Sequence, residues 1–296
     1  MKSNGELSET LASAVLKCGG AVVRVQARRR TPSSGCVWSE GVIVTAHHAI
    51  ERDEGIEVGL SDGKIVKAAL IGRDPTTDLA ALRIEASGLE RPDWAMAPEL
   101  KVGHLAMALA RPGRTTRATL GIISALGEEW RTPSGGRVDL YLQADLSLPS
   151  GFSGGMLVDT AGRALGVNSS WLLPRHSLAI PAVTVQRVVE ALLSEGSIRR
   201  GFLGVGAFPI RFPEKLEQQI GQDSGLILVS LQPEGPAEKA GLLLGDILLS
   251  LEGESLTGID DLVELLDRRR IGTEVTLRIL RAGQTQERTV AVGARA

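Results

Sequence analysis

The sequence contains few cysteines, few histidines and few aromatic residues. Its 296 residues include two cysteines, Cys18 and Cys36, and four histidines. No spacing of these residues suits a zinc site, so we expect no metal and no other cofactor. Two thiols without a disulfide pattern are typical of a reducing compartment. Aromatic residues make up 3% of the chain, so aliphatic side chains and alanine must form any core.

Long hydrophobic runs and a strong charge excess are missing as well. No stretch approaches the run of about 18 apolar residues that a transmembrane helix needs. Residues 1–16 are polar and predict a short amphipathic helix rather than a signal peptide, so the predicted location is cytoplasmic. The net charge of −2 gives no electrostatic reason to expect nucleic acid or an anionic membrane as a partner.

Glycine, in contrast, is concentrated around one serine. Gly151, Gly154 and Gly155 surround Ser153, and glycine tolerates the backbone conformations of tight turns. Such a turn can expose the serine hydroxyl and point two backbone N–H groups at one place, as in an oxyanion hole. Glycine-flanked serines are also common in ordinary turns. The motif therefore indicates catalysis only if partner residues exist elsewhere in the chain.

Two upstream segments supply the partners that activate a serine hydroxyl, namely a base and a group that orients it. An apolar, β-branched run ends at His47 and His48, and a turn that contains Asp78 leads into a second apolar run. The chain order is histidine, aspartate, serine, which is the order in chymotrypsin. Taken singly, each residue has an ordinary alternative: a polar strand end, a turn cap or a loop hydroxyl.

Three sequence blocks carry these residues: T-A-H-H-A-I, D-P-T-T-D-L-A-A-L and G-F-S-G-G-M-L. They resemble the catalytic blocks of the HtrA family, which read close to T-N-N-H-V-V, D-P-x-T-D-L-A-V-L and G-N-S-G-G-P-L. The resemblance extends over nearly the whole chain after about residue 20. It implies a mostly β fold, in which a chymotrypsin- or trypsin-like double β-barrel protease domain precedes a smaller α+β PDZ domain.

The resemblance assigns a role to each residue of the three blocks. His48 would be the general base, Asp78 its orienting carboxylate and Ser153 the nucleophile. The N–H groups of Gly151 and Ser153 would form the oxyanion hole. The family spacing selects His48 over His47, which we expect at the surface or behind the site, because neighbouring residues of an extended segment point to opposite faces.

The same resemblance places Leu148, Val167 and Asn168 along the primary specificity pocket. No acidic residue stands at the matching pocket floor, so we expect the pocket to reject basic side chains, whose charge would be buried unpaired, and to accept medium aliphatic ones. The chain departs from the family at Phe152, where the family has asparagine. In some related proteases a carboxylate at this position pairs with a newly freed N-terminus during activation, and a phenylalanine ring excludes that route. Whether the oxyanion hole is formed in the resting protein is left open.

The domain organisation follows from the breaks in the sequence. From residue 21 onward, short β-rich runs alternate with Gly/Pro turns, which is typical of an all-β barrel or sandwich. Residues 181–193 have helical periodicity, and residues 194–197 have the composition of a linker. We therefore expect a protease domain at 1–196, with a short N-terminal segment at 1–20, and a PDZ domain at 200–292.

The last third of the chain resembles a bacterial, circularly permuted PDZ domain. The stretch G-F-L-G-V matches the carboxylate-binding loop, so Phe202, Leu203, Gly204 and Val205 would bind a peptide. In such a domain the partner's C-terminal strand pairs with an exposed sheet edge, and backbone N–H groups hold its carboxylate. A helix at about 260–270 would form the other wall of the groove.

The sequence thus predicts a serine endopeptidase that acts on unfolded or exposed apolar polypeptide segments, with a PDZ domain that binds peptide C-termini and regulates activity. The alternatives are a proteolytically weak or silent peptide sensor or chaperone, which Phe152 favours, and a pure scaffold. By resemblance alone we expect a homotrimer, although residues 1–30 lack the aromatic side chains that usually hold one. Most HtrA relatives work in the cell envelope, so the predicted cytoplasmic location is a further departure.

Overall fold

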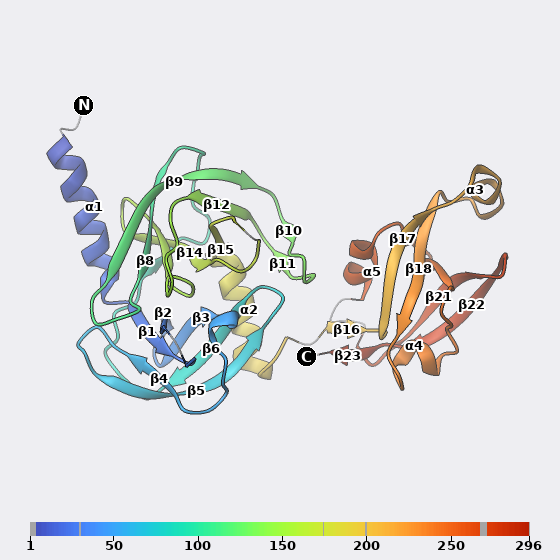
Figure 1. Cartoon of the computed structure of the whole chain (residues 1–296), viewed down its shortest axis with the longest axis horizontal. Coiled ribbons are helices and arrows are strands. Elements are labelled where there is room, and N and C mark those ends of the chain that lie inside the picture. Colours follow the sequence, from blue (N-terminus) through green and yellow to red (C-terminus); the bar gives the residue numbers. More distant parts are fainter. Residues whose placement is uncertain (1–3, 30, 174, 199, 267–270, 296) are drawn as a thin grey trace. The chain divides into compact units, whose positions relative to one another are not determined.

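The structure is a computed structural model that describes residues 4–29, 31–173, 175–198, 200–266 and 271–295. The chain separates into two compact units, Met1–Ile198 and Arg199–Ala296. Strands dominate both units, which confirms the prediction of a mostly β chain (Figure 1).

The first unit begins with helix α1 (Asn4–Gly19), close to the amphipathic helix expected at the N-terminus. Antiparallel strands then close into a barrel in the order β1-β2-β3-β6-β5-β4. The strands of this first barrel are β1 (Val22–Gln26), β2 (Ser33–Ser39), β3 (Val42–Ala46), β4 (Ile56–Gly59), β5 (Ile65–Asp74) and β6 (Leu79–Ile84). All residues of β3 are buried, as its β-branched and apolar sequence predicts.

A second barrel follows, with the strand order β13-β8-β9-β12-β15-β14 and a pairing between β13 and β14 that closes it. Strand β7 lies beside β14, and β10 and β11 form a small separate hairpin. The bounds are β7 (Asp93–Trp94), β8 (Leu105–Ala110), β9 (Arg117–Gly127), β10 (Trp130–Arg131), β11 (Arg137–Val138), β12 (Tyr141–Asp145), β13 (Met156–Asp159), β14 (Arg163–Ser169) and β15 (Leu178–Pro181). The two barrels confirm the expected double-barrel fold.

Helix α2 (Ala182–Glu195) follows β15 and confirms the helical periodicity of that segment. Its apolar face packs into the core cluster that the first barrel also forms. The helix ends at Gly196, whose left-handed φ of 72° suits glycine. A Cβ atom on Gly72 of β5 would lie 2.1 Å from the Gly196 carbonyl oxygen, so glycine permits this close approach. The helix includes two residues of the predicted 194–197 linker.

The second unit is built on a sheet with the strand order β17-β18-β19-β21-β22, to which β20 adds beside β19; β16 and β23 pair separately. The bounds are β16 (Arg200–Phe202), β17 (Val205–Arg211), α3 (Glu214–Ile220), β18 (Ser224–Leu231), α4 (Pro236–Lys239), β19 (Ile247–Leu251), β20 (Glu254–Ser255), α5 (Ile259–Leu265), β21 (Glu274–Arg281), β22 (Gln284–Ala291) and β23 (Gly293–Arg295). The helix predicted at about 260–270 is α5, and residues 267–270 lie outside the described residues.

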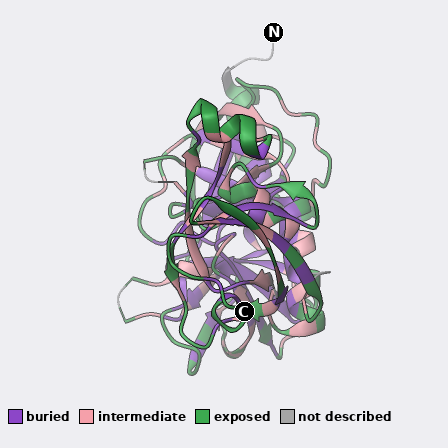
Figure 2. Cartoon of the chain, turned by 90° about the vertical axis from the view of Figure 1, so that its right-hand side faces the viewer, coloured by how far each residue is buried: buried purple, intermediate pink, exposed green. Residues whose placement is uncertain are grey.

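Each unit has its own hydrophobic core. Buried residues follow the strands, whereas the loops are largely exposed (Figure 2). Among the described residues, Phe152 and Phe212 are the only buried aromatic side chains, so aliphatic packing dominates, as the composition predicts. None of the described helices combines the length and the apolar character needed to cross a membrane.

Candidate active site

Two neighbouring strands of the first barrel bring His48 and Asp78 together. His48 lies in the 3-10 helix η1 (His47–Ala49) directly after β3, and Asp78 directly precedes β6, which pairs with β3. The Nδ1 atom of His48 lies 2.9 and 2.8 Å from the two carboxylate oxygens, and the His48 backbone N–H donates to Oδ1 at 2.9 Å. Because an ionised carboxylate only accepts hydrogen bonds, Nδ1 carries the proton in this contact, and Nε2 of the neutral ring is left as an acceptor.

The backbone of Asp78 is constrained as tightly as its side chain. The residue is completely buried and has a φ of 59°, which is uncommon for a residue with a side chain. Its carbonyl oxygen accepts the His47 N–H at 3.0 Å, and its Oδ2 accepts the Ser169 hydroxyl at 2.6 Å. Strained conformations of this kind persist only where the surrounding structure fixes them.

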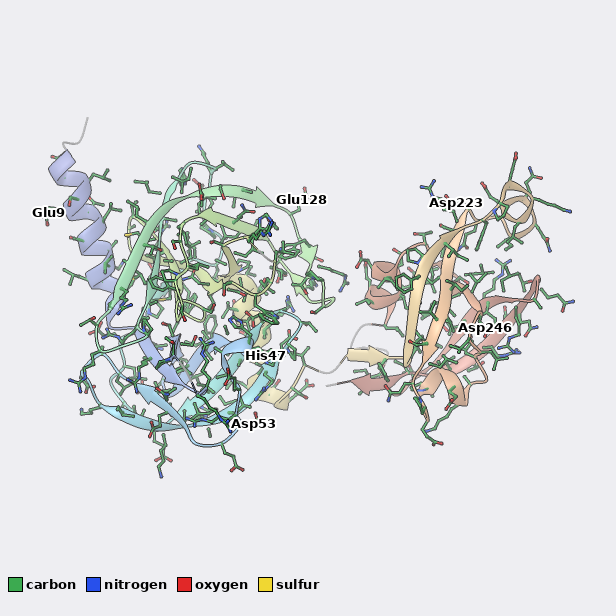
Figure 3. All side chains as sticks on the ribbon, viewed as in Figure 1. Glu9, His47, Asp53, Glu128, Asp223 and Asp246 are labelled. Atoms are coloured by element: carbon green, nitrogen blue, oxygen red, sulfur yellow. The ribbon has the colours of Figure 1, made fainter. Side chains whose placement is uncertain are left out.

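His47 is separate from this contact. The prediction that the two histidines occupy an extended segment is wrong, because both lie in η1. Of the two histidines, His48 is the one whose ring contacts the Asp78 carboxylate within the described residues. His47 lies in the first barrel after β3 (Figure 3), and its Nδ1 is buried without a partner in the described residues. Burial and then the charge of Arg73 lower the pKa of His47, so this ring is neutral at pH 7.

Ser153 lies between β12 and β13, in a segment that we call the serine loop (residues 149–155). Gly151 has a φ of 91°, and the Phe152 N–H donates to the Pro149 carbonyl at 3.0 Å. A four-residue turn with a positive-φ glycine in third position is typical of type II. Neither the Gly151 N–H nor the Ser153 N–H donates to another described residue, so both can bind an oxygen atom of a ligand.

Strand β2 of the first barrel holds the serine loop. Three of its side chains donate to three carbonyl groups of the loop: Ser33 Oγ to Ser153 (2.6 Å), Ser34 Oγ to Gly151 (2.7 Å) and Cys36 Sγ to Gly154 (3.1 Å). Burial raises the pKa of Cys36 well above its ordinary value, so the thiol keeps the proton that it donates. Since each peptide group is planar, holding these carbonyl groups also fixes the N–H groups of the residues that follow them, Phe152, Gly154 and Gly155.

Three consecutive residues at the end of β14 each contact one member of the predicted triad. Ser169 Oγ donates to Asp78 Oδ2 at 2.6 Å, Ser170 Oγ lies 2.9 Å from Ser153 Oγ, and the Trp171 ring stacks on His48 with 5.6 Å between ring centres and 18° between planes. Within the described residues, no hydrogen bond joins Ser153 Oγ to the His48 ring. None of the three catalytic sequence blocks includes this segment, and its only signal in the sequence is the pair of serines before an aromatic residue.

Two of the three residues predicted to form the specificity pocket line the same cavity, and the third does not. Leu148 and Asn168 line a small cavity, together with Ala144, Leu146, Leu157, Ser177, Leu178 and Ala179. Val167 is completely buried in the main core and is absent from this lining. The lining residues of the described cavity include no acidic side chain. The Asn168 Nδ2 group is buried and has no partner among the described residues, which leaves its two N–H donors unused.

Phe152 is a buried residue of the serine loop. Its side chain is 2% exposed and packs with Ala108 and Ala110 of β8. Leu146 and Leu148 pack against the same cluster. The ring therefore stabilises the loop by apolar packing, in a position where the family pattern has a polar side chain.

In the second unit, the predicted peptide-binding residues connect β16 to β17. The carbonyl groups of Leu203 and Gly204 accept the N–H groups of Ala237 and Gln232, at 2.8 and 2.7 Å. The N–H groups of Leu203 and Gly204 donate to no other described residue. Strand β17 is the last strand of its sheet, so one of its edges has no partner among the described strands, and α5 lies beside it. The Leu203 side chain, in contrast, is buried in the core.

Comparisons with known proteins agree with this geometry. Residues 33–167 match the model of the trypsin-like peptidase domain, and residues 210–292 match that of the PDZ domain. The fold and the site thus define a trypsin-like peptidase domain joined to a PDZ domain. The chain belongs to the HtrA family of DegP-like serine endoproteases, as the sequence resemblance predicts.

Individual relatives give the extent of the similarity. The chain is 35% identical over 275 residues to a probable periplasmic serine endoprotease DegP-like of Halomonas elongata, covering 90% of this chain and 57% of the relative. The corresponding protein of Chlamydia trachomatis is 33% identical over 278 residues, with 91% and 55% covered. The chain therefore spans little more than half the length of these relatives.

Solved structures of similar proteins include the serine endoprotease from Yersinia pestis, with a TM-score of 0.78 and 29% identity over 100% of both chains. The HtrA-type protease AlgW with a decapeptide has a TM-score of 0.77 and 26% identity, with 97% of this chain and 99% of the other covered. The likeness thus extends across both units of the chain.

Proposed function

We propose that this chain is an HtrA-type serine endopeptidase that cleaves unfolded or exposed apolar polypeptide segments. In this proposal Ser153 is the nucleophile, His48 the general base and Asp78 the group that orients the imidazole. The contact of His48 Nδ1 with both oxygens of the buried Asp78 carries the proposal, because it fixes the tautomer in which Nε2 can accept a proton.

The steps follow from these positions. Ser153 Oγ attacks the carbonyl carbon of the substrate peptide and its proton passes to His48 Nε2. The N–H groups of Gly151 and Ser153 stabilise the negative charge that develops on the carbonyl oxygen. The imidazolium then gives its proton to the leaving amine, and a water molecule hydrolyses the acyl-enzyme by the same route. Asp78 stays ionised throughout and stabilises the imidazolium.

The proposed specificity pocket is the small cavity lined by Leu146, Leu148 and Asn168. The space has no room for a water molecule in this structure, so a side chain before the cleaved bond enters only after the walls move apart, and their largely apolar character favours a medium aliphatic one. The lining has no acidic group in its described residues to pair with a basic side chain, and a buried unpaired charge is costly. Comparing peptides with valine, alanine or lysine at that position tests this preference, and faster cleavage after lysine would contradict it.

Fluorophosphonate labelling tests the nucleophile, because the reagent modifies activated serines. The unaltered chain should be labelled and should hydrolyse casein, whereas Ser153→Ala should do neither. Ser150→Ala is the matched control, since this serine lies on the same loop but is exposed. Labelling of Ser153→Ala at the rate of the unaltered chain would overturn the assignment.

A second candidate function is a silent peptide sensor or chaperone. The contact of Ser153 Oγ with Ser170 rather than with His48 favours it, because a serine that does not reach its base is unreactive. The two candidates differ in the labelling experiment. A sensor binds peptides but is not labelled, and Ser153→Ala leaves its function unchanged.

We further propose that the second unit binds peptide C-termini at the loop Phe202–Val205, with the peptide added as a strand along β17. The free N–H groups of Leu203 and Gly204 and the unpaired edge of β17 support this role. Fluorescence anisotropy with an apolar peptide should show binding of the free acid and loss of binding of the C-terminal amide. Labelling of Ser153 with and without that peptide then tests whether binding regulates the activity.

Assembly and location stay predictions. A homotrimer is proposed from the family resemblance, and sedimentation velocity measures it directly. The DegP-like relatives are named as periplasmic, whereas the two buried free thiols fit the predicted cytoplasmic location. Fractionation of the source cells distinguishes the two compartments.

A further inference from the structure

We infer that Ser170 is a positioning residue that holds the Ser153 hydroxyl in a resting orientation, turned away from the base. The inference rests on the proposed function, since it concerns the orientation of the proposed nucleophile. The two hydroxyl oxygens lie 2.9 Å apart, and either can be the donor. Whichever group donates, the contact keeps Ser153 Oγ turned toward Ser170, and no hydrogen bond among the described residues links it to the His48 ring.

The His48 ring is not the part that can move. Its Nδ1 contacts both oxygens of Asp78, and its backbone N–H donates to the same carboxylate at 2.9 Å. One face of the ring is covered by Trp171. Moving the imidazole toward Ser153 would disrupt both contacts of Nδ1 with the carboxylate and the stacking on Trp171, so the ring is held in place.

The backbone of Ser153 is equally fixed. Its carbonyl oxygen accepts the Ser33 hydroxyl at 2.6 Å and the Ser34 N–H at 3.2 Å. The remaining freedom is rotation about the Cα–Cβ bond, and a serine side chain has three staggered positions about that bond. Reorienting Oγ is therefore a side-chain rotation about this bond, and the contact with Ser170 opposes it.

Ser170 is itself anchored to the site. It directly follows Ser169, whose hydroxyl donates to Asp78 at 2.6 Å, and it precedes Trp171, which stacks on His48. The two residues that flank Ser170 in the chain thus contact the other two members of the triad, Asp78 and His48. A single net hydrogen bond shifts the balance between two orientations by about fivefold. A substrate that favours the orientation toward His48 shifts the population the other way.

The test is the rate of fluorophosphonate labelling of Ser170→Ala in the full chain. Removing the hydroxyl should raise the labelling rate and the kcat of peptide cleavage about fivefold, with little change in KM, because substrate contacts are kept. Ser170→Thr, which keeps a hydroxyl, should restore the slow rate. Ser194→Ala is the matched control, because its hydroxyl binds only the Ala191 carbonyl on the exposed side of α2.

Each outcome decides the inference. Equal or slower labelling of Ser170→Ala overturns it, and so does Ser170→Thr labelling as fast as Ser170→Ala. If the unaltered chain and Ser170→Ala both resist labelling, the inference and the proposed function both fail. If Ser153→Ala is still labelled, Ser153 is not the nucleophile and the proposed function fails. If Ser153→Ala is not labelled but Ser170→Ala is labelled at the rate of the unaltered chain, only the proposed role of Ser170 fails.

Discussion

The hydroxyl of Ser34 donates to the carbonyl oxygen of Gly151 at 2.7 Å, so a strand of the first barrel holds a loop of the second. Ser34 Oγ also accepts the Arg111 N–H at 2.8 Å, and both residues are buried. The Gly151 carbonyl shares a peptide plane with the Phe152 N–H, which closes the turn by donating to Pro149 at 3.0 Å, and Gly151 itself has a φ of 91°. The proposed oxyanion hole therefore depends on a side chain outside its own loop.

Ser34→Ala should reduce both stability and reactivity. The substitution leaves the Gly151 carbonyl without a donor and the Arg111 N–H without an acceptor in a buried place, which costs about 1–3 kcal/mol. We expect a lower Tm and slower fluorophosphonate labelling of Ser153. Thr184→Val is the matched control, since it removes a buried hydroxyl that binds Asp139 and not the serine loop. It should lower the Tm and leave labelling unchanged; normal labelling of Ser34→Ala would show that the turn holds without this bond.

The two adjacent histidines should differ sharply in their effect on activity. His48→Ala removes the ring bound to Asp78 and should lower kcat by several orders of magnitude, whereas His47→Ala should keep it within a few-fold. His47 has no partner at its buried Nδ1 among the described residues and makes only a backbone contact with Asp78. Steady-state cleavage of a fluorogenic peptide measures both variants, and comparable losses would mean that His47 also takes part.

The resemblance to the HtrA family predicts the double barrel, the PDZ fold and the partnership of His48 with Asp78, because the family's sequence blocks can be recognised in this chain. It did not predict how the serine loop is held. Ser33 and Ser153 are 120 residues apart, and only the packing of the two barrels brings them together. The proposed role of Ser170 cannot be predicted for the same reason, because it depends on the contact with the Ser153 hydroxyl and not on adjacent residues of the chain. Val167 does not line the cavity, because successive side chains of a strand point to opposite faces and that of Val167 points into the core.

Phe152→Ala should destabilise the first unit and slow labelling. The ring is 2% exposed, and truncating a buried phenylalanine costs about 3–5 kcal/mol. The cavity would lie directly beneath the serine loop. Phe152→Leu keeps most of the apolar volume and should retain more of both properties. Urea unfolding followed by tryptophan fluorescence measures the stability, because all tryptophans lie in the first unit; an unchanged midpoint for the alanine variant would contradict the packing role.

Gly204→Ala should weaken peptide binding by the second unit. Gly204 has a φ of 78°, and a Cβ atom there would lie 3.3 Å from the Gln232 Cβ and 3.4 Å from the Phe202 ring. The 3.4 Å approach is ordinary contact, but the 3.3 Å approach is tight, so Gln232 or the loop must give by a few tenths of an ångström, which is expected to displace the N–H groups that would hold a carboxylate. Gly221→Ala is the control, since its φ is 79° but a Cβ atom there meets nothing within 4 Å. If both variants bound the peptide with the same affinity in anisotropy titrations, the loop would not be part of the binding site.

The ion pair between Asp246 and Arg281 should make the second unit sensitive to acid. Burial alone would raise the pKa of Asp246, but the hydrogen bonds and charge of Arg281, together with the Leu243 N–H, outweigh it and lower the pKa. The two Arg281 nitrogens contact the carboxylate at 2.7 Å each. A folded-state pKa below the unfolded value stabilises the fold above the unfolded pKa of about 3.9. That stabilisation is lost as the pH falls through the folded-state pKa.

Calorimetry of the full chain from pH 7 to pH 2 measures this loss, and Asp246→Asn is the informative variant. At pH 7 the variant should unfold at a lower temperature than the unaltered chain, because Arg281 loses its charged partner. As the pH falls below about 4 the two transitions should begin to converge, and they should coincide once it has passed the folded-state pKa of Asp246, since protonation then removes the same charge from the unaltered chain. Tryptophan fluorescence identifies the transition of the first unit, which should be the same in both proteins. A difference in the other transition that stays constant down to pH 2 would show that Asp246 acts through packing and not through its charge.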